Sequence, residues 1–171
     1  QDEIENALDS MDALIALMTP DFHDSLWTDQ EVGFAFGRGV PIISIRLGKD
    51  PYGFIGKFQA LRCSWDDAAI KIIKILINES KVIDSFIESI NNCINYGQAN
   101  NLSQILPEIS RLDETQLKKL IHAYNSNSQI NESFGFNGKM PSRYGSGVIP
   151  HLKRLTGRSF SLDRHGKIEE S

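Results

Sequence analysis

The sequence has few cysteines and histidines, and none of them forms a metal-binding pattern. Its 171 residues include two cysteines, Cys63 and Cys93, and four histidines. The cysteines make no CxxC pair, and the histidines lack the spacing of metal ligands. We therefore expect no structural metal, and a reducing, cytoplasmic setting.

Long hydrophobic runs are also missing. The longest, such as residues 13–18, are far shorter than the ~20 residues of a membrane span, so no transmembrane helix is expected. The chain opens with Gln1 and an acidic stretch, which has neither the basic start nor the apolar core of a signal peptide. We expect that it begins inside a longer protein. With 40% hydrophobic and 23% charged residues, the composition is that of one or two soluble globular domains.

Neither sign of charge dominates the whole chain, but the two parts differ. Residues 1–100 hold 8 basic and 15 acidic side chains, a net of −7, whereas residues 101–171 hold 10 basic and 7 acidic, a net of +3. This asymmetry suggests two modules. It fits two differently solvated surfaces, or a polyanion partner for the second module.

The first part of the chain alternates helical and strand patterns. Helices are expected over 2–10, from Ser25 to about Gly39, and from Ser64–Asp67 onward; buried strands over 12–18 and 41–46, with a weaker one over 58–62. Nearly continuous apolar strands favour a sheet covered on both faces. The prediction is an α/β fold: a partial, flavodoxin-like parallel sheet of three strands.

The second part is mainly helical. The expected elements are helices over 82–96, 102–106, 113–124 (with Asp113 as N-cap) and 148–155, a glycine-rich loop over 135–147, and a terminal hairpin over 159–169. Helices followed by a hairpin are compatible with a winged-helix-like module. We expect two domains, residues 1–80 and 81–171.

A candidate site follows the first predicted strand, where ligands bind in open α/β sheets. Trp27 and Glu31 lie one helical turn apart and face the same way. A carboxylate beside an indole is partly desolvated, which strengthens its interaction with positive charge developing on a substrate. Helix capping by Ser25 or Thr28 and packing by Trp27 explain the same residues, so both interpretations stay open.

Residues 12–33, 37–45 and 50–57 resemble bacterial Toll/interleukin receptor (TIR) domains, and the pattern Ser25-x-Trp27-x-x-x-Glu31 is distinctive of that family. The resemblance covers about residues 1–80, the second half of such a domain. It implies that Glu31 is the catalytic residue for cleaving the nicotinamide–ribose bond of NAD, which gives ADP-ribose or a cyclic form. It further implies that Trp27 and Ser25 line the NAD pocket.

The chemistry of a carboxylate suits this reaction. Loss of nicotinamide passes through an oxocarbenium-like ribose, which a nearby carboxylate stabilises. NAD is the substrate, and no cofactor or metal is expected. The sequence departs from active bacterial members at Thr28, where they often have cysteine.

By the same resemblance, the family's first strands and the mobile loop that help form the nucleotide pocket would precede Gln1. The exposed edge of the strand over 12–18 then favours pairing with another chain. We therefore expect this fragment to be inactive unless a second polypeptide, a copy of itself or another TIR chain, restores the sheet. The setting would be bacterial defence or stress signalling, and the alternative is a non-catalytic adaptor that acts by assembly.

Other motifs give weaker signals. Residues 53–57 lack the spacing of a phosphate loop, His23 is read as a solvated loop residue, and Cys63 as buried and inert. Residues 139–167 hold seven basic side chains against one acidic. These favour a solvated face on an interaction module, with nucleic-acid binding through phosphate contacts as the alternative.

Overall fold

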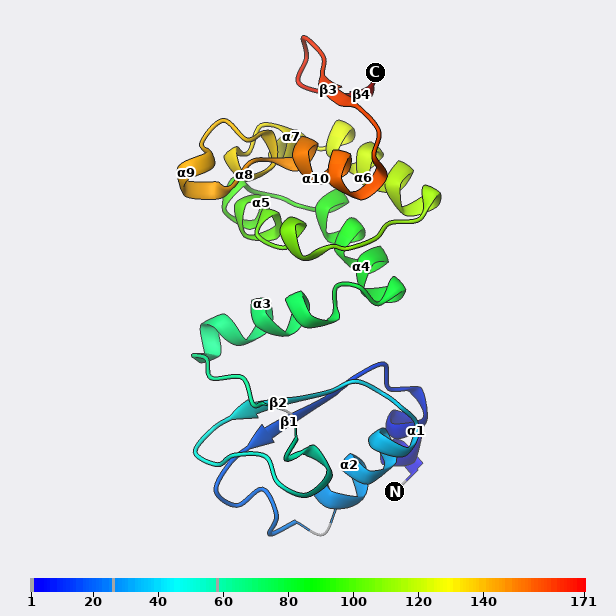
Figure 1. Cartoon of the computed structure of the whole chain (residues 1–171), viewed down its shortest axis with the longest axis vertical. Coiled ribbons are helices and arrows are strands. Elements are labelled where there is room, and N and C mark those ends of the chain that lie inside the picture. The colour runs from blue at the N-terminus through cyan, green and yellow to red at the C-terminus, as the bar shows by residue number, and fades with distance from the viewer. Residues whose placement is uncertain (1, 26, 58) are drawn as a thin grey trace. The chain divides into compact units, whose positions relative to one another are not determined.

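The structure is a computed structural model that describes residues 2–25, 27–57 and 59–171. Contacts divide the chain into two units, residues 1–72 and 73–171. The division falls within the helix Trp65–Leu76, which Figure 1 labels α3. The first unit is mixed α/β, and the second is mainly helical with a small antiparallel hairpin.

The first unit is built around two parallel strands. Its elements are α1 (Asp2–Ser10), β1 (Leu14–Met18), α2 (Thr28–Gly37), β2 (Ile42–Arg46), the short 3-10 helix η1 (Gly53–Ile55) and α3 (Trp65–Leu76), which continues past residue 72. β1 pairs with β2 from Leu14 opposite Ile42 to Met18 opposite Arg46. The helix–strand alternation and the parallel pairing are those predicted from the sequence.

The expected third strand over 58–62 forms only one parallel bridge, between Leu61 and Ile45. Leu61 donates its N–H to the Ser44 carbonyl at 2.8 Å and accepts from the Arg46 N–H at 3.0 Å. Phe58, at the start of this prediction, lies outside the described residues. The segment does not lengthen because α3 begins at residue 65, only four residues further on, with Ser64 Oγ accepting from the Asp67 N–H at 3.3 Å. The prediction of three strands is therefore wrong for the described residues, in which the parallel sheet has two strands.

A core cluster of the first unit lies on one face of the sheet, and Ile43 and Ile45 of β2 are buried on the other face. The cluster consists of Ala16, Met18, Val32 and Ile55 with partly buried Leu14, Phe22, Ile42 and Tyr52. β1 is less covered on its other face, since the side chain of Leu17 is 40% exposed. The prediction that β1 is covered on both faces is therefore wrong for the residues described.

The second unit packs several short helices around α4 and α6. Its elements are α4 (Ser80–Asn91), α5 (Tyr96–Ser103), η2 (Leu106–Glu108), α6 (Glu114–Ser126), α7 (Ser128–Asn131), α8 (Phe134–Asn137), α9 (Pro141–Tyr144), α10 (Val148–Thr156) and the hairpin strands β3 (Phe160–Leu162) and β4 (Ile168–Glu170). The predicted N-cap of α6 is confirmed: Asp113 Oδ1 accepts from the Gln116 N–H at 2.8 Å, and the Gln116 side chain caps in return.

The helix expected over 82–96 ends five residues earlier than predicted, and Tyr96 begins a separate helix, α5. α4 ends at Asn91, and Asn95 caps α5 by accepting the Gln98 N–H at 2.8 Å. The helical spacing of apolar residues continues through the break, but the helix itself does not. Cys93 is buried, whereas Ile94 is 80% exposed. Asparagine side chains that bind nearby backbone groups compete with helix continuation, which explains the break.

The glycine-rich segment over 135–147 is not a simple loop, since it contains α8 and α9. Two of its backbone stretches touch: a Cβ added to Gly147 would lie 2.7 Å from the Gly138 nitrogen and 2.9 Å from the Phe136 carbonyl oxygen. Gly147 also has φ +81° and ψ −178°, a conformation that only glycine adopts readily. This contact sets the start of α10.

The terminal hairpin was predicted correctly, and one asparagine of α6 hydrogen-bonds to its second strand. Asn125 of α6 accepts the Ile168 N–H at 2.7 Å and donates its amide to the Ile168 carbonyl at 3.0 Å. The Asn125 side chain thus makes the two backbone hydrogen bonds to Ile168 that a neighbouring strand would make. In the part of the chain that the structure describes, no helix is long and apolar enough to cross a membrane.

We predict that Gly147→Ala destabilises the protein more than Gly145→Ala. Both glycines have the same backbone conformation, so each substitution introduces strain of about 1–3 kcal/mol. Only at Gly147 does the new methyl group also meet backbone atoms, whereas space is open at Gly145. Urea unfolding of the two variants measures the difference. Equal free energies of unfolding would contradict the close backbone contact.

Candidate functional site

The carboxyl ends of β1 and β2 bring two loops together. The carbonyl oxygen of Met18, the last residue of β1, accepts the N–H groups of Leu47 at 3.0 Å and Lys49 at 3.1 Å. The loop that follows β1 and the loop over 47–52 therefore begin side by side. Their polar side chains gather where open α/β sheets bind ligands.

Ser25, Trp27 and Glu31 lie in the first of these loops and the start of α2. Ser25 Oγ accepts the Trp27 N–H at 3.3 Å, and the Trp27 carbonyl accepts the Glu31 N–H at 2.9 Å. The second bond places Trp27 and Glu31 one turn apart on one helix face, as the spacing predicts. Trp27 is 52% exposed, so it does not pack in a core within the described chain.

Capping at this helix start differs from the sequence expectation. Thr28 Oγ1 donates to the carbonyls of Phe22 at 2.7 Å and Ser25 at 2.9 Å, and so ties the helix to its preceding loop. Trp27 occupies the N-cap position without a side-chain cap. Glu31 is half-buried, and no hydrogen bond or ion pair of its side chain is found within the described residues. Its carboxylate is therefore available to a ligand.

A cavity of about 270 Å³ opens beside this motif, on a different face of α2. The described residues that line it are Phe22, Asp29, Val32, Tyr52, Gly53 and Ile55. Asp29 and Val32 are three positions apart and share a face, whereas Trp27 and Glu31 share another. The cavity wall therefore carries Asp29 and not Glu31.

Asp29 and Tyr52 in the cavity wall belong to a polar network that also includes His23 and Lys49. Tyr52 Oη donates to Asp29 Oδ1 at 2.7 Å, and the ring of His23 lies edge-on to the Tyr52 ring with 4.6 Å between centroids. Lys49 Nζ contacts His23 Nε2. Burial, followed by the hydrogen bond and charge of Asp29, raises the pKa of Tyr52 to about 12, so Tyr52 stays protonated and donating at neutral pH.

Sequence reasoning missed most of this network. His23 was expected to be a solvated loop residue, and Asp29 and Lys49 were not singled out. His23 is in fact half-buried, and its Nδ1 is a buried atom without a hydrogen-bond partner in the described structure. The sequence did offer one clue to these residues: each lies in a segment that follows a predicted parallel strand.

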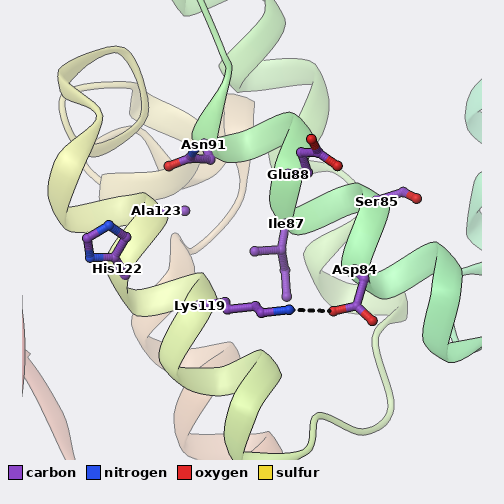
Figure 2. Close-up of a pocket in the computed structure, with 8 residues that line it drawn as sticks. All are labelled: Asp84, Ser85, Ile87, Glu88, Asn91, Lys119, His122 and Ala123. Carbon is purple, nitrogen blue, oxygen red and sulfur yellow. Dashed lines mark hydrogen bonds and ion pairs between the residues drawn. The ribbon is translucent and has the colours of Figure 1, made fainter.

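A second, larger hollow of about 410 Å³ lies between α4 and α6. Figure 2 shows Lys119 of α6 extending toward Asp84 of α4, with 3.5 Å between Nζ and Oδ1, and His122 farther along the same helix. Ile87 and Ala123 form buried parts of its wall. Within the described residues, no group of three or more histidine, cysteine, aspartate or glutamate side chains is placed to hold a metal ion.

Two of the basic residues in the 139–167 segment serve the fold. Arg154 Nη2 donates to the carbonyl of Ile109 at 2.7 Å and, at 3.4 Å, to those of Leu106 and Pro107. Arg158 pairs with Glu114 and lies 3.7 Å from Glu170. These contacts reduce the charge left for a phosphate backbone.

No protein family, curated protein or solved structure shows a significant match to the chain. The resemblance to TIR domains therefore rests on the motif itself, together with its place after β1.

We predict that Asp29→Asn lowers the pKa of Tyr52 from about 12 toward its ordinary value near 10, because it removes the carboxylate that favours the protonated phenol. Tyr124 is the internal control, since burial alone raises its pKa to about 12. NMR titration of ring-labelled tyrosine follows both. A Tyr52 pKa unchanged by the substitution would contradict the Asp29 contact.

The same pKa shift makes stability depend on pH. A phenol that binds its proton more tightly in the folded state stabilises the fold below about pH 10, and this contribution is lost as pH rises to about 12. Tyr52→Phe removes this contribution, so the free energy of unfolding of the variant should fall less between about pH 10 and pH 12 than that of the unchanged protein.

Proposed function

We propose that this chain is part of a TIR-type NAD nucleosidase of bacterial defence or stress signalling, acting in the cytoplasm. Glu31 is the catalytic carboxylate, Trp27 the pocket wall and Ser25 a residue at its margin. The observation that carries the proposal is the Ser25-x-Trp27-x-x-x-Glu31 motif in the segment that follows the carboxyl end of a parallel strand, with exposed Trp27 and half-buried Glu31 on one helix face.

The chemistry requires a carboxylate that is free to face the ribose. As the nicotinamide–ribose bond breaks, positive charge develops on the sugar, and Glu31 stabilises it and holds its hydroxyl groups. Trp27 offers a ring 52% exposed, on which a planar group of NAD stacks. The product is ADP-ribose or a cyclic form.

The proposal includes the completion of the sheet. Among the described residues β1 has β2 as its partner strand on one side. The Leu14 N–H donates to Pro41 and the Met18 carbonyl accepts from Leu47, so alternation turns the N–H groups of Ile15 and Leu17 to the opposite edge. An additional strand, from a second polypeptide, would pair there and cover Leu17. The complete fold would then be flavodoxin-like, and the second unit a winged-helix-like module.

The rival function is a non-catalytic adaptor that assembles through the same β1 edge and the exposed face of α2. The exposure of Leu17 and Trp27 supports it, since exposed apolar side chains favour protein contacts. The adaptor needs no chemistry from Glu31.

Nicotinamide release from NAD distinguishes the two functions. In assembled protein, Glu31→Gln is expected to lower turnover at least about a hundredfold, since the charge that stabilises the transition state is lost. Gln30→Ala, an exposed neighbour on the same helix, is the control and should keep full activity.

Each other outcome is informative. Turnover that survives Glu31→Gln would overturn the catalytic role. Partner binding that is unchanged by Glu31→Gln, with no NAD turnover in any assembled state, would favour the adaptor. Cleavage by the purified monomer of 171 residues would show that no second polypeptide is needed.

A further inference from the structure

A small aromatic hollow in the second unit has features that neither the NAD proposal nor the basic tail explains. It has a volume of about 210 Å³ and is lined by Tyr96, Asn100, Glu132, Ser133, Phe134 and Tyr144. Three of these six residues are aromatic and one is a carboxylate. The lining comes from α5, the end of α7, α8 and α9.

The aromatic side chains are not core residues. Tyr96 is 46% exposed and Phe134 is 42% exposed, although both are large and apolar. Phe134 stacks on Tyr144, with 6.0 Å between ring centroids and 20° between their planes. Exposed apolar side chains that gather at one hollow, instead of lying singly, are typical of ligand-binding or interaction sites.

The carboxylate of Glu132 is held among these rings. Its Oε2 accepts the Tyr96 hydroxyl at 2.7 Å, which raises the pKa of Tyr96 and keeps that phenol neutral. The hollow therefore combines one negative charge with ring faces that are themselves negative. Such a set attracts cations.

One cation already uses this chemistry inside the chain. The guanidinium carbon of Arg143 lies 5.2 Å from the centroid of the Tyr144 ring. Arg143 lies over the Tyr144 ring, so the exposed parts of Tyr96 and Phe134 remain for a ligand beside Glu132.

The lining is positioned before any ligand arrives. Asn100 Oδ1 accepts the Gly135 N–H at 2.9 Å, and Ser133 Oγ donates to the Ile130 carbonyl at 2.7 Å. Gly135 lets α8 pack closely on α5, since an added Cβ would lie 2.7 Å from Ser103 Cβ. A preformed site loses little conformational entropy on binding.

We propose that this hollow binds a weakly hydrated organic cation of the trimethylammonium type, with Glu132 as counter-ion and Tyr96 and Phe134 as its ring walls. A quaternary ammonium fits because it gives up water easily and interacts with several ring faces at once. The cation is carried either by a free small molecule such as choline or by a trimethyllysine side chain of a partner protein.

Titration of the full chain with choline, followed by NMR shifts of the ring protons, tests the site. We expect saturable shifts at Tyr96 and Phe134, and none with dimethylbutanol, the neutral carbon isostere of choline. A peptide with one trimethyllysine distinguishes the sources: tighter binding of the peptide indicates a protein partner, and equal or weaker binding a free ligand. Absence of saturation, or equal binding of the isostere, would overturn the proposal.

Variants add a test of direction. Glu132→Gln and Phe134→Leu should each weaken choline binding about threefold to fivefold, because each removes one attraction at an exposed site. Arg143→Gln should strengthen it by a similar factor, since a competing positive charge is lost. Glu88→Gln, an exposed carboxylate of α4 at the other hollow, is the control. An Arg143→Gln variant that binds choline no better, with Glu132→Gln unchanged, would refute the electrostatic basis.

Discussion

The carbonyl oxygen of Met18 determines the arrangement of the first unit. It closes β1 by accepting two N–H groups from the chain that leaves β2, so both loops after the parallel strands start from one point. From there, residues far apart in the sequence meet: Asp29 contacts Tyr52, and His23 contacts Lys49. The position of the candidate site follows from the parallel pairing, since only parallel strands place both carboxyl ends at one edge.

In the second unit, asparagine side chains carry out much of the joining between elements. Asn127 donates to the carbonyls of Ile90 and Cys93 at 3.1 and 2.9 Å and so attaches the end of α4 to the start of α7. Asn125 binds the terminal hairpin, and Asn100 binds α8. Short helices leave many unpaired backbone groups at their ends, and these amides satisfy them. The unit therefore depends on specific polar contacts as well as on its apolar core.

Local signals made much of this predictable. The apolar runs gave β1 and β2, and Asp113 with Gln116 marked the start of α6, because capping and hydrophobic periodicity act over a few residues. Trp27 and Glu31 were placed correctly one turn apart for the same reason, whereas Ser25, expected at the helix start, lies in the loop before α2.

What was missed depends on contacts distant in the sequence. Leu61 meets β2 at only one residue, and the break at Ile94 depends on Asn95 capping the next helix. The pairing of Asp29 with Tyr52 spans 23 positions and leaves no periodic pattern. The aromatic hollow could not be predicted for the same reason, since its lining residues come from four elements and no local sequence pattern connects them.

Helix α2 presents two chemically different faces to its surroundings. One carries Glu31 beside Trp27, and the other carries Asp29 in the cavity with Tyr52. With side chains a helix is about 10 Å across, so a molecule held on one face does not displace a molecule held on the other. A molecule bound in the Tyr52 cavity would therefore leave Trp27 and Glu31 accessible, so the two faces of α2 can be probed independently of each other.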